Sequence, residues 1–177
     1  DVGRTLTGAE AVNIVNSSLV GRARAHLQAG RGAQALADAN QVPAGFSYAL
    51  PYVDDVGNRT RLSNRLWQFT VDRGSIGIAP ALRVTDPRVP YLPPGQHPYN
   101  AFDNADQTEF YAQQKYPSYA APIRLASKME ADYIAAEAQG TSAMLDLIEA
   151  RRAANNQGAY TGPTDAPSVL VEFFEQR

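Results

Sequence analysis

The sequence contains no cysteine, so disulfide bonds, thiol nucleophiles and cysteine metal ligands are excluded. It has only two histidines, and neither belongs to a catalytic pattern: His26 falls in an alanine-rich helical stretch and His97 in a Pro-Gly-Gln-His-Pro turn. The Gly-x-Ser-x-Gly elbow of serine hydrolases is missing. No pair of carboxylates stands out for glycosidic cleavage. The sequence therefore predicts a protein that is not an enzyme.

The chain also lacks an excess of charge and a long apolar run. Its 16 basic and 18 acidic residues leave a net charge of -2, which gives no support to nucleic-acid binding. No apolar stretch approaches the roughly 18 residues that a membrane-spanning helix requires. Hydrophobic residues still make up 44% of the 177 residues, enough for a folded core. We therefore expect a single domain over residues 1–177.

Alanine is concentrated in residues 7–42, which we expect to form a pair of helices. Seven alanines lie between Ala23 and Ala39, and the segment Gly30–Gly32 marks a turn. Small side chains let helices pack closely, and Ala35 is one of three alanines at the small positions of a tetratricopeptide-like repeat. The large aromatic positions of that repeat are not filled, so a generic alanine-rich hairpin is the alternative.

A second helix pair is predicted over Pro122–Asn156, followed by a terminal helix that completes the segment 122–177. Gly140 ends the first helix of the pair and Thr141 begins the second. On the second helix we expect Leu145 and Ile148 to be buried. On the first helix, four residues recur at spacings of four, four and three and share one apolar face: Leu125, Met129, Tyr133 and Ala136.

Residues 43–121 differ in composition from both helical segments, and we expect an irregular loop region there. Eight of the 12 prolines lie in residues 80–122, and seven of the 16 aromatic residues lie in residues 91–119. Proline interrupts regular helix, so this stretch is not helical throughout. Residues 45–53 look extended, and residues 65–71 show a short β-like alternation, with a helical turn as the alternative.

Aromatic residues of this loop region are the candidate binding residues. Flat rings cover the apolar faces of sugars while nearby amides bind hydroxyl groups. Tyrosine and tryptophan also anchor protein interfaces. A third interpretation is that the rings only hold the loop on the helices. The predicted ligand- or partner-binding set is Trp67, Tyr91, Tyr99, Phe102, Tyr111, Tyr116 and Tyr119.

One run of oxygen-bearing side chains, NAFDNAD, offers a weak metal site. Asn100, Asp103, Asn104 and Asp106 carry the oxygen ligands that calcium prefers. Their spacing does not follow the EF-hand pattern, and turn or capping chemistry explains them more simply. We therefore expect no metal and no cofactor.

Three segments near the end of the chain form an ordered set of motifs. Two helices are followed by the terminal segment VLVEFFEQR, and Asp86-Pro87-Arg88 lies in the preceding loop region. This order resembles the carboxy-terminal part of the SusD/RagB family of nutrient-binding outer-membrane lipoproteins. There, an R-x-AE-x-x-L-x-x-AEA-x-x-G helix precedes an L-N-x-x-R-x-R-A helix. The matching residues are Arg124, Ala126, Glu130, Ala131, Ile134, Ala136, Glu137, Ala138, Gly140, Leu147, Ile148, Arg151 and Ala153.

The resemblance implies a mainly α fold of tetratricopeptide-like helical hairpins with long proline- and aromatic-rich loops. It also implies a non-enzymatic binding protein of the Gram-negative cell envelope, periplasmic or outer-membrane associated. Such a protein partners an outer-membrane transporter and captures a glycan or a peptide.

Two other functions are open beside this one. The first is a structural subunit that uses the same helical fold to dock on a larger membrane protein complex. The second is an envelope hydrolase. Family members are longer and carry a lipidated cysteine, so we expect this chain to correspond to a carboxy-terminal part or a shortened member.

Overall fold

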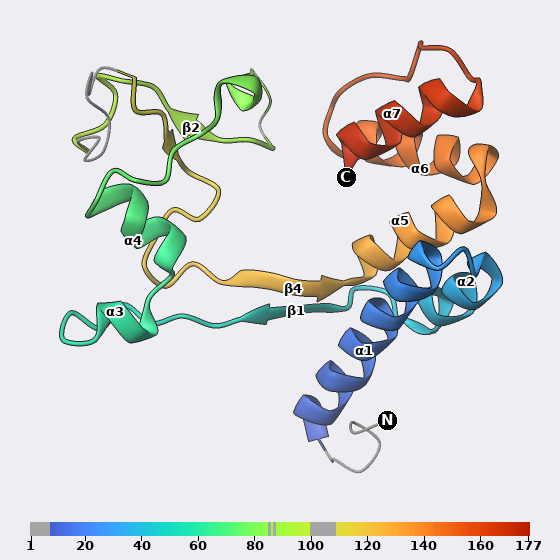
Figure 1. Ribbon diagram of the computed structural model, residues 1–177, viewed down its shortest axis with the longest axis horizontal. Helices are drawn as coiled ribbons and strands as arrows, with labels where there is room; N and C mark the ends of the chain where they lie inside the picture. Colours follow the sequence, from blue (N-terminus) through green and yellow to red (C-terminus); the bar gives the residue numbers. More distant parts are fainter. Residues whose placement is uncertain (1–7, 85, 87, 100–108) are drawn as a thin grey trace. The chain divides into compact units, whose positions relative to one another are not determined.

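The computed structural model describes residues 8–84, 86, 88–99 and 109–177 (Figure 1). The described chain is mainly α-helical, as the sequence predicts. It forms seven α-helices, a 3-10 helix and four short strands. None of the helices in this described part is long and apolar enough to cross a membrane.

The chain divides into two compact units, named here unit 1 and unit 2. Unit 1 combines Asp1–Tyr48 with Arg124–Arg177, and unit 2 is the continuous stretch Ala49–Ile123. The chain leaves unit 1 within strand β1 (Ser47–Leu50) and re-enters it within strand β4 (Ile123–Ser127), and these strands form a two-stranded sheet. In the sequence, unit 2 is thus an insertion between the two segments of unit 1. The single domain expected for the whole chain stays a prediction.

Unit 1 begins with the helix pair predicted for its alanine-rich end. Helix α1 spans Gly8–Gln28 and helix α2 spans Gly32–Gln41. Helix α5 (Lys128–Gln139) packs against both of them (Figure 1). Small side chains allow the close approach of these helices. Their shared core consists of short aliphatic side chains: Val20, Ala23, Ala35, Ala39, Val42, Ala126, Ala131, Ile134 and Ala135.

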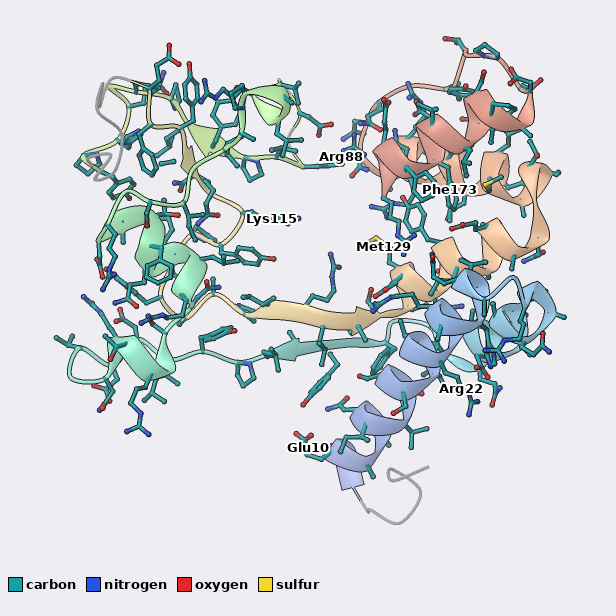
Figure 2. All side chains as sticks on the ribbon, viewed as in Figure 1. Glu10, Arg22, Arg88, Lys115, Met129 and Phe173 are labelled. Atoms are coloured by element: carbon teal, nitrogen blue, oxygen red, sulfur yellow. The ribbon has the colours of Figure 1, made fainter. Side chains whose placement is uncertain are left out.

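The second half of unit 1 continues with helix α6 (Thr141–Ala154) and helix α7 (Ala166–Gln176). Gly140, at a φ of 100°, separates α5 from α6 in a backbone conformation that favours glycine. Phe173 of α7, labelled in Figure 2, meets the Tyr133 ring of α5 edge to face with centroids 5.0 Å apart. The three helices share a core of larger side chains: Tyr133, Ala136, Met144, Ile148, Val169 and Phe173.

The predicted helix start at Pro122 is wrong. Residues 123–127 are strand β4, and α5 begins only at Lys128, because the Ser127 hydroxyl accepts a hydrogen bond from the Glu130 backbone N–H and caps the helix there. Leu125, expected on the apolar helix face, lies on the strand and is 51% exposed.

The burial predicted for α6 is half correct. Ile148 is fully buried, as expected, whereas Leu145 is only partly buried at the edge of the same core.

Unit 2 is built from short elements joined by irregular segments. Its helices are α3 (Arg59–Leu62), α4 (Arg65–Val71) and the 3-10 helix η2 (Pro80–Leu82). Strand β2 (Tyr91–Leu92) pairs antiparallel with β3 (Ala112–Gln113). The extended conformation expected within residues 45–53 is confirmed by β1.

Residues 65–71 form α4, so the strand-like alternation is wrong and its alternative, a helical turn, is confirmed. Asn64 decides this outcome. Its side-chain oxygen accepts hydrogen bonds from the backbone N–H groups of Leu66 and Trp67, which supplies a helix cap. A single capping residue therefore outweighs a period-two pattern over one short segment.

Candidate functional site

Six of the seven aromatic residues of the predicted site lie in the described part of unit 2. The seventh, Phe102, lies outside the described residues, as does the oxygen-rich run Asn100, Asp103, Asn104 and Asp106. Among the described residues, no group of three or more histidine, cysteine or acidic side chains is placed to hold a metal ion.

Trp67 and Tyr99 belong to one cluster of rings. Trp67 projects from α4, is only 9% exposed, and meets Tyr99 edge to face with centroids 5.9 Å apart. Tyr99 stacks on the His97 imidazole at 5.4 Å, and His97 Nε2 lies 2.7 Å from the Phe110 carbonyl oxygen. Tyr99 keeps part of its surface exposed while Trp67 is buried. A ligand would therefore contact Tyr99 before Trp67.

Tyr91 and Tyr111 form a second ring pair, edge to face at 5.6 Å. The Arg83 guanidinium lies 3.9 Å from the centre of the Tyr111 ring. Arg83 is itself held, because its Nε donates to the Ile78 carbonyl at 3.3 Å and its Nη1 lies 3.4 Å from Glu109 Oε2. A cation over a ring face is attracted by the π electrons and occupies that face. One face of Tyr111 is therefore closed to a stacking ligand.

Tyr119 is fixed in the same way by Arg59. The Arg59 guanidinium lies 4.0 Å from the ring centre, and its Nε donates to Asp54 at 2.8 Å. The Tyr119 hydroxyl donates to Asp72 Oδ1 at 2.5 Å. Partial burial and, next, this hydrogen bond raise the pKa of Tyr119 to about 12. At neutral pH the phenol is a neutral donor and has no role as a base.

Tyr116 is positioned through its backbone. Its N–H donates to the Gln113 side-chain oxygen at 3.0 Å, while its carbonyl accepts from the Gln113 amide nitrogen at 3.4 Å. The Tyr116 ring is half-buried. The six described residues are thus brought into one unit but not into a single stack of rings.

Sequence reasoning missed the buried polar residues that position these rings. Asn64 is fully buried; its side-chain nitrogen donates to the Ala121 carbonyl at 2.7 Å and its backbone N–H to the Tyr119 carbonyl at 2.7 Å. Thr70 is also fully buried and accepts from the Gln113 side chain at 3.2 Å. An asparagine directly before an apolar stretch is a helix-start signal that would have found Asn64.

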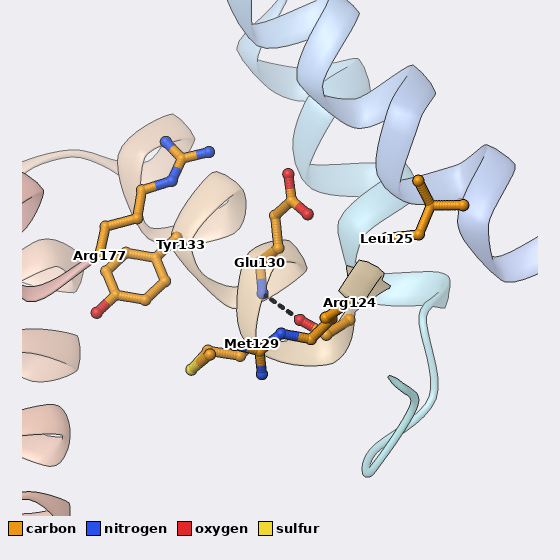
Figure 3. Close-up of a pocket in the computed structure, with 7 residues that line it drawn as sticks. Arg124, Leu125, Met129, Glu130, Tyr133 and Arg177 are labelled. Atoms are coloured by element: carbon orange, nitrogen blue, oxygen red, sulfur yellow. Dashed lines mark hydrogen bonds between the residues drawn. The ribbon is translucent and has the colours of Figure 1, made fainter. Parts of the chain in front are cut away.

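Unit 1 has a separate pocket at the start of α5, which holds about 170 Å³ (Figure 3). Arg177 and Tyr133 are drawn on one side of this pocket and Leu125 on the other (Figure 3). The Tyr133 hydroxyl donates to the Gln176 carbonyl at 2.5 Å, so this wall is fixed. The pocket is lined by Arg124, Leu125, Ser127, Met129, Glu130, Tyr133 and Arg177.

Most charges of this pocket are paired. Glu130 forms an ion pair with Arg24 of α1, and Arg177 lies 3.9 Å from Glu137. Arg124 has no ion pair among the described residues. None of the predicted site residues lines the pocket, so it is separate from the rings of unit 2.

Comparison with models of known protein families, with curated proteins and with solved structures finds no match to this chain.

Proposed function

We propose that the protein is a non-enzymatic binding protein of the Gram-negative cell envelope, of the SusD/RagB kind that its sequence resembles. In this proposal it sits on an outer-membrane transporter and captures a glycan or a peptide. Unit 2 supplies the contact surface. Unit 1 is the scaffold, in which α1–α2 and α5–α6 act as tetratricopeptide-like hairpins.

The observation that carries the proposal is the set of fixed, partly exposed rings in unit 2. Tyr91, Tyr99, Tyr111 and Tyr119 are each half-buried, and each contacts another ring or an arginine. Side chains that are already ordered lose little conformational entropy on binding. Rings also bring a large contact area for each residue. Such a surface suits a recognition role.

The guanidinium groups bear on the choice between glycan and peptide. Arg83 and Arg59 each cover one face of a tyrosine, at 3.9 Å and 4.0 Å from the ring centres. A neutral sugar needs an open ring face for stacking, whereas a peptide can use ring edges and hydrogen bonds. These two rings support a peptide, and Tyr99 is the better candidate for sugar stacking.

The fluorescence of Trp67 tests the proposal, because it is the only tryptophan and lies against Tyr99. Titration with neutral oligosaccharides and with short peptides should give a saturable change for at least one class. The variant Tyr99→Ala should abolish that change, while Tyr160→Ala, a matched loss of a ring in unit 1, should preserve it. A saturable change that survives in Tyr99→Ala, or no change with either class at millimolar ligand, contradicts the proposal.

A structural role on a larger membrane complex is a second candidate, supported by the outer face of α7. Leu170, Val171 and Phe174 are 37%, 61% and 50% exposed there. Apolar side chains clustered on a surface helix are typical of a protein interface. A mild-detergent pull-down separates the two functions: Phe174→Asp should release a scaffold from its complex, whereas Tyr99→Ala should not.

A further inference from the structure

Two arginines of unit 2 share one phenylalanine ring. Arg65 and Phe69 lie four residues apart in α4, and Arg73 follows four residues later in the turn directly after the helix, so the three fall on one side of this segment. The guanidinium carbons of Arg65 and Arg73 lie 4.8 Å and 5.3 Å from the Phe69 ring centre. Both distances are measured to one point, so the two carbons are at most about 10 Å apart. Two like charges are thereby held close together.

Neither cation is neutralised by a carboxylate among the described residues. Arg65 Nη1 donates to the Thr60 carbonyl and to Gln68 Oε1, each at 2.9 Å, and both acceptors are uncharged. These bonds fix the Arg65 guanidinium without using its remaining donors. Asp72, next to Arg73 in the sequence, accepts the Tyr119 hydroxyl beneath Arg59.

This arrangement differs from every other arginine–ring contact in the described part of unit 2. Arg59 and Arg83 also lie over rings, but Asp54 and Glu109 accompany them. Arg65 and Arg73 are exposed to solvent and lack such a partner. A planar guanidinium presents paired N–H groups that match the oxygens of carboxylate, sulfate or phosphate.

We propose that Arg65, Phe69 and Arg73 form an anion-binding clamp for a ligand that carries two or more negatively charged groups. The shared chemistry is a pair of sulfate, phosphate or carboxylate groups spaced by up to about 10 Å. An acidic glycan or the headgroups of an anionic lipid surface can supply it. The Phe69 ring holds the two cations in place before the ligand arrives. This inference does not depend on the proposed capture of a neutral glycan or peptide, since Arg65, Phe69 and Arg73 are not among the rings proposed to bind that ligand.

The test compares a sulfated oligosaccharide with its desulfated counterpart by titration calorimetry on the full chain. The sulfated form should bind and the desulfated form should not. In the variant R65Q/R73Q we expect affinity to fall about tenfold or more, since two charge-assisted contacts are lost. The control R31Q/R124Q removes the same charge from exposed positions of unit 1 and should bind as the wild type does. Circular dichroism checks that each variant keeps its helicity.

A further variant separates the clamp from mere surface charge. F69L keeps both charges and an apolar side chain but removes the ring, so affinity should fall by roughly three- to fivefold. The proposal would be overturned if F69L kept wild-type affinity or if R31Q/R124Q weakened binding as much as R65Q/R73Q does. It would also be overturned if the sulfated and desulfated oligosaccharides bound equally well.

A second experiment, with lipid vesicles, identifies the source of the anion. Flotation with phosphatidylglycerol-containing vesicles, against neutral phosphatidylcholine vesicles, measures binding to headgroups. If the wild-type protein floats with the anionic vesicles and R65Q/R73Q does not, the result supports the clamp with a lipid surface as the source of the anion. If the protein binds the sulfated oligosaccharide in calorimetry but does not float with vesicles, the result supports an acidic glycan. No binding in either arm at low salt overturns the clamp. Tyr99→Ala should leave both arms unchanged, which keeps this test distinct from that of the proposed function.

Discussion

The most deeply buried side chains of the two units differ in chemistry. At 2% exposure or less, those of unit 1 are apolar, whereas those of unit 2 include Ser63, Asn64 and Thr70. Unit 1 buries polar side chains less completely, such as Asn16 and Asp38 at 7% and 6% exposed.

Unit 1 buries short aliphatic side chains between helices, with Tyr133 and Phe173 added in its second half. Unit 2 buries polar side chains beside its rings, and Asn64 and Thr70 are both fully shielded from solvent. Helices satisfy their own backbone, so they can be packed with hydrocarbon alone. Irregular segments cannot, and side chains must supply the missing hydrogen bonds.

This difference predicts how each unit responds to substitution. An aliphatic core loses free energy roughly in proportion to the volume removed and tolerates exchanges of similar size. A hydrogen-bonded core depends on particular atoms, because one lost partner leaves a buried donor or acceptor unsatisfied. Unit 1 should thus be sensitive to the size of side chains and unit 2 to their chemistry. The same polar side chains position the rings of unit 2.

The largest expected effect is the loss of a ring from unit 1. Phe173 is fully buried against Tyr133, so Phe173→Ala should lower the free energy of unfolding by roughly 3–5 kcal/mol. Its neighbour Phe174 is 50% exposed and supplies the matched control. Urea denaturation followed by helical circular dichroism measures both. Equal losses in the two variants would show that burial does not govern the stability of unit 1.

The second-largest expected loss of stability follows the removal of a buried, hydrogen-bonded side chain from unit 2. Asn64→Ala removes the cap of α4 and leaves the Ala121 carbonyl without its donor, which should cost roughly 2–3 kcal/mol. Trp67 fluorescence during denaturation reports on this unit. Asn58→Ala is the control, because Asn58 is exposed and makes no capping bond. Replacement of Asn64 by aspartate should keep the cap but set a buried carboxylate oxygen against the Ala121 carbonyl oxygen, so it should also destabilise unit 2.

The helices of unit 1 could be predicted from the sequence, and much of unit 2 could not. Alanine clusters, hydrophobic spacing and the glycine at 140 are signals repeated over many residues, so they gave both helix pairs. The errors at residues 123–127 and 65–71 arise where one side chain decides the outcome. Ser127 delays α5, and Asn64 starts α4. A single cap carries little weight against a longer pattern when only the sequence is seen.

The candidate site, too, could be predicted only in part from the sequence. The composition of residues 91–119 pointed to the rings. It did not point to the arginines that lie on them. Arg59 reaches Tyr119 and Arg83 reaches Tyr111 from distant parts of the sequence. Only the fold brings these pairs together. The spacing of Arg65, Phe69 and Arg73 fits a helical face, but the alternation of apolar and polar residues in 65–71 fits a strand as well, so the sequence leaves both open.

A smaller effect is expected where unit 2 packs backbone against backbone. A methyl group at Gly77 would lie 3.0 Å from the Tyr111 carbonyl oxygen and from the Phe110 ring. Gly77→Ala should therefore cost about 1–3 kcal/mol, as other overpacked sites do. At Gly57 the same methyl would meet only the Asp55 carboxylate at 3.5 Å, an ordinary contact. Thermal unfolding should show a loss at Gly77 and little change at Gly57. Equal losses of stability in the two variants would mean that the backbone around Gly77 shifts to make room for the added methyl group.

The smallest effect concerns the ionisation of Tyr119, and its sign follows from the direction of the pKa shift. The folded state raises the pKa of this phenol to about 12, chiefly through burial and then through Asp72. The neutral form is thus favoured on folding. Its contribution to stability is fully present below the ordinary tyrosine pKa near 10 and is lost as the pH rises through about 12.

Tyr119→Phe keeps the ring under Arg59 but gives up the hydrogen bond to Asp72. At pH 8 it should therefore be less stable by about 0.5–1 kcal/mol, and the difference should shrink between pH 10 and pH 11. Absorbance of the phenolate should also show a titration step near pH 12 that vanishes in Tyr119→Phe. A stability difference that stays constant over this range would show that the hydroxyl of Tyr119 is hydrated rather than held by unit 2.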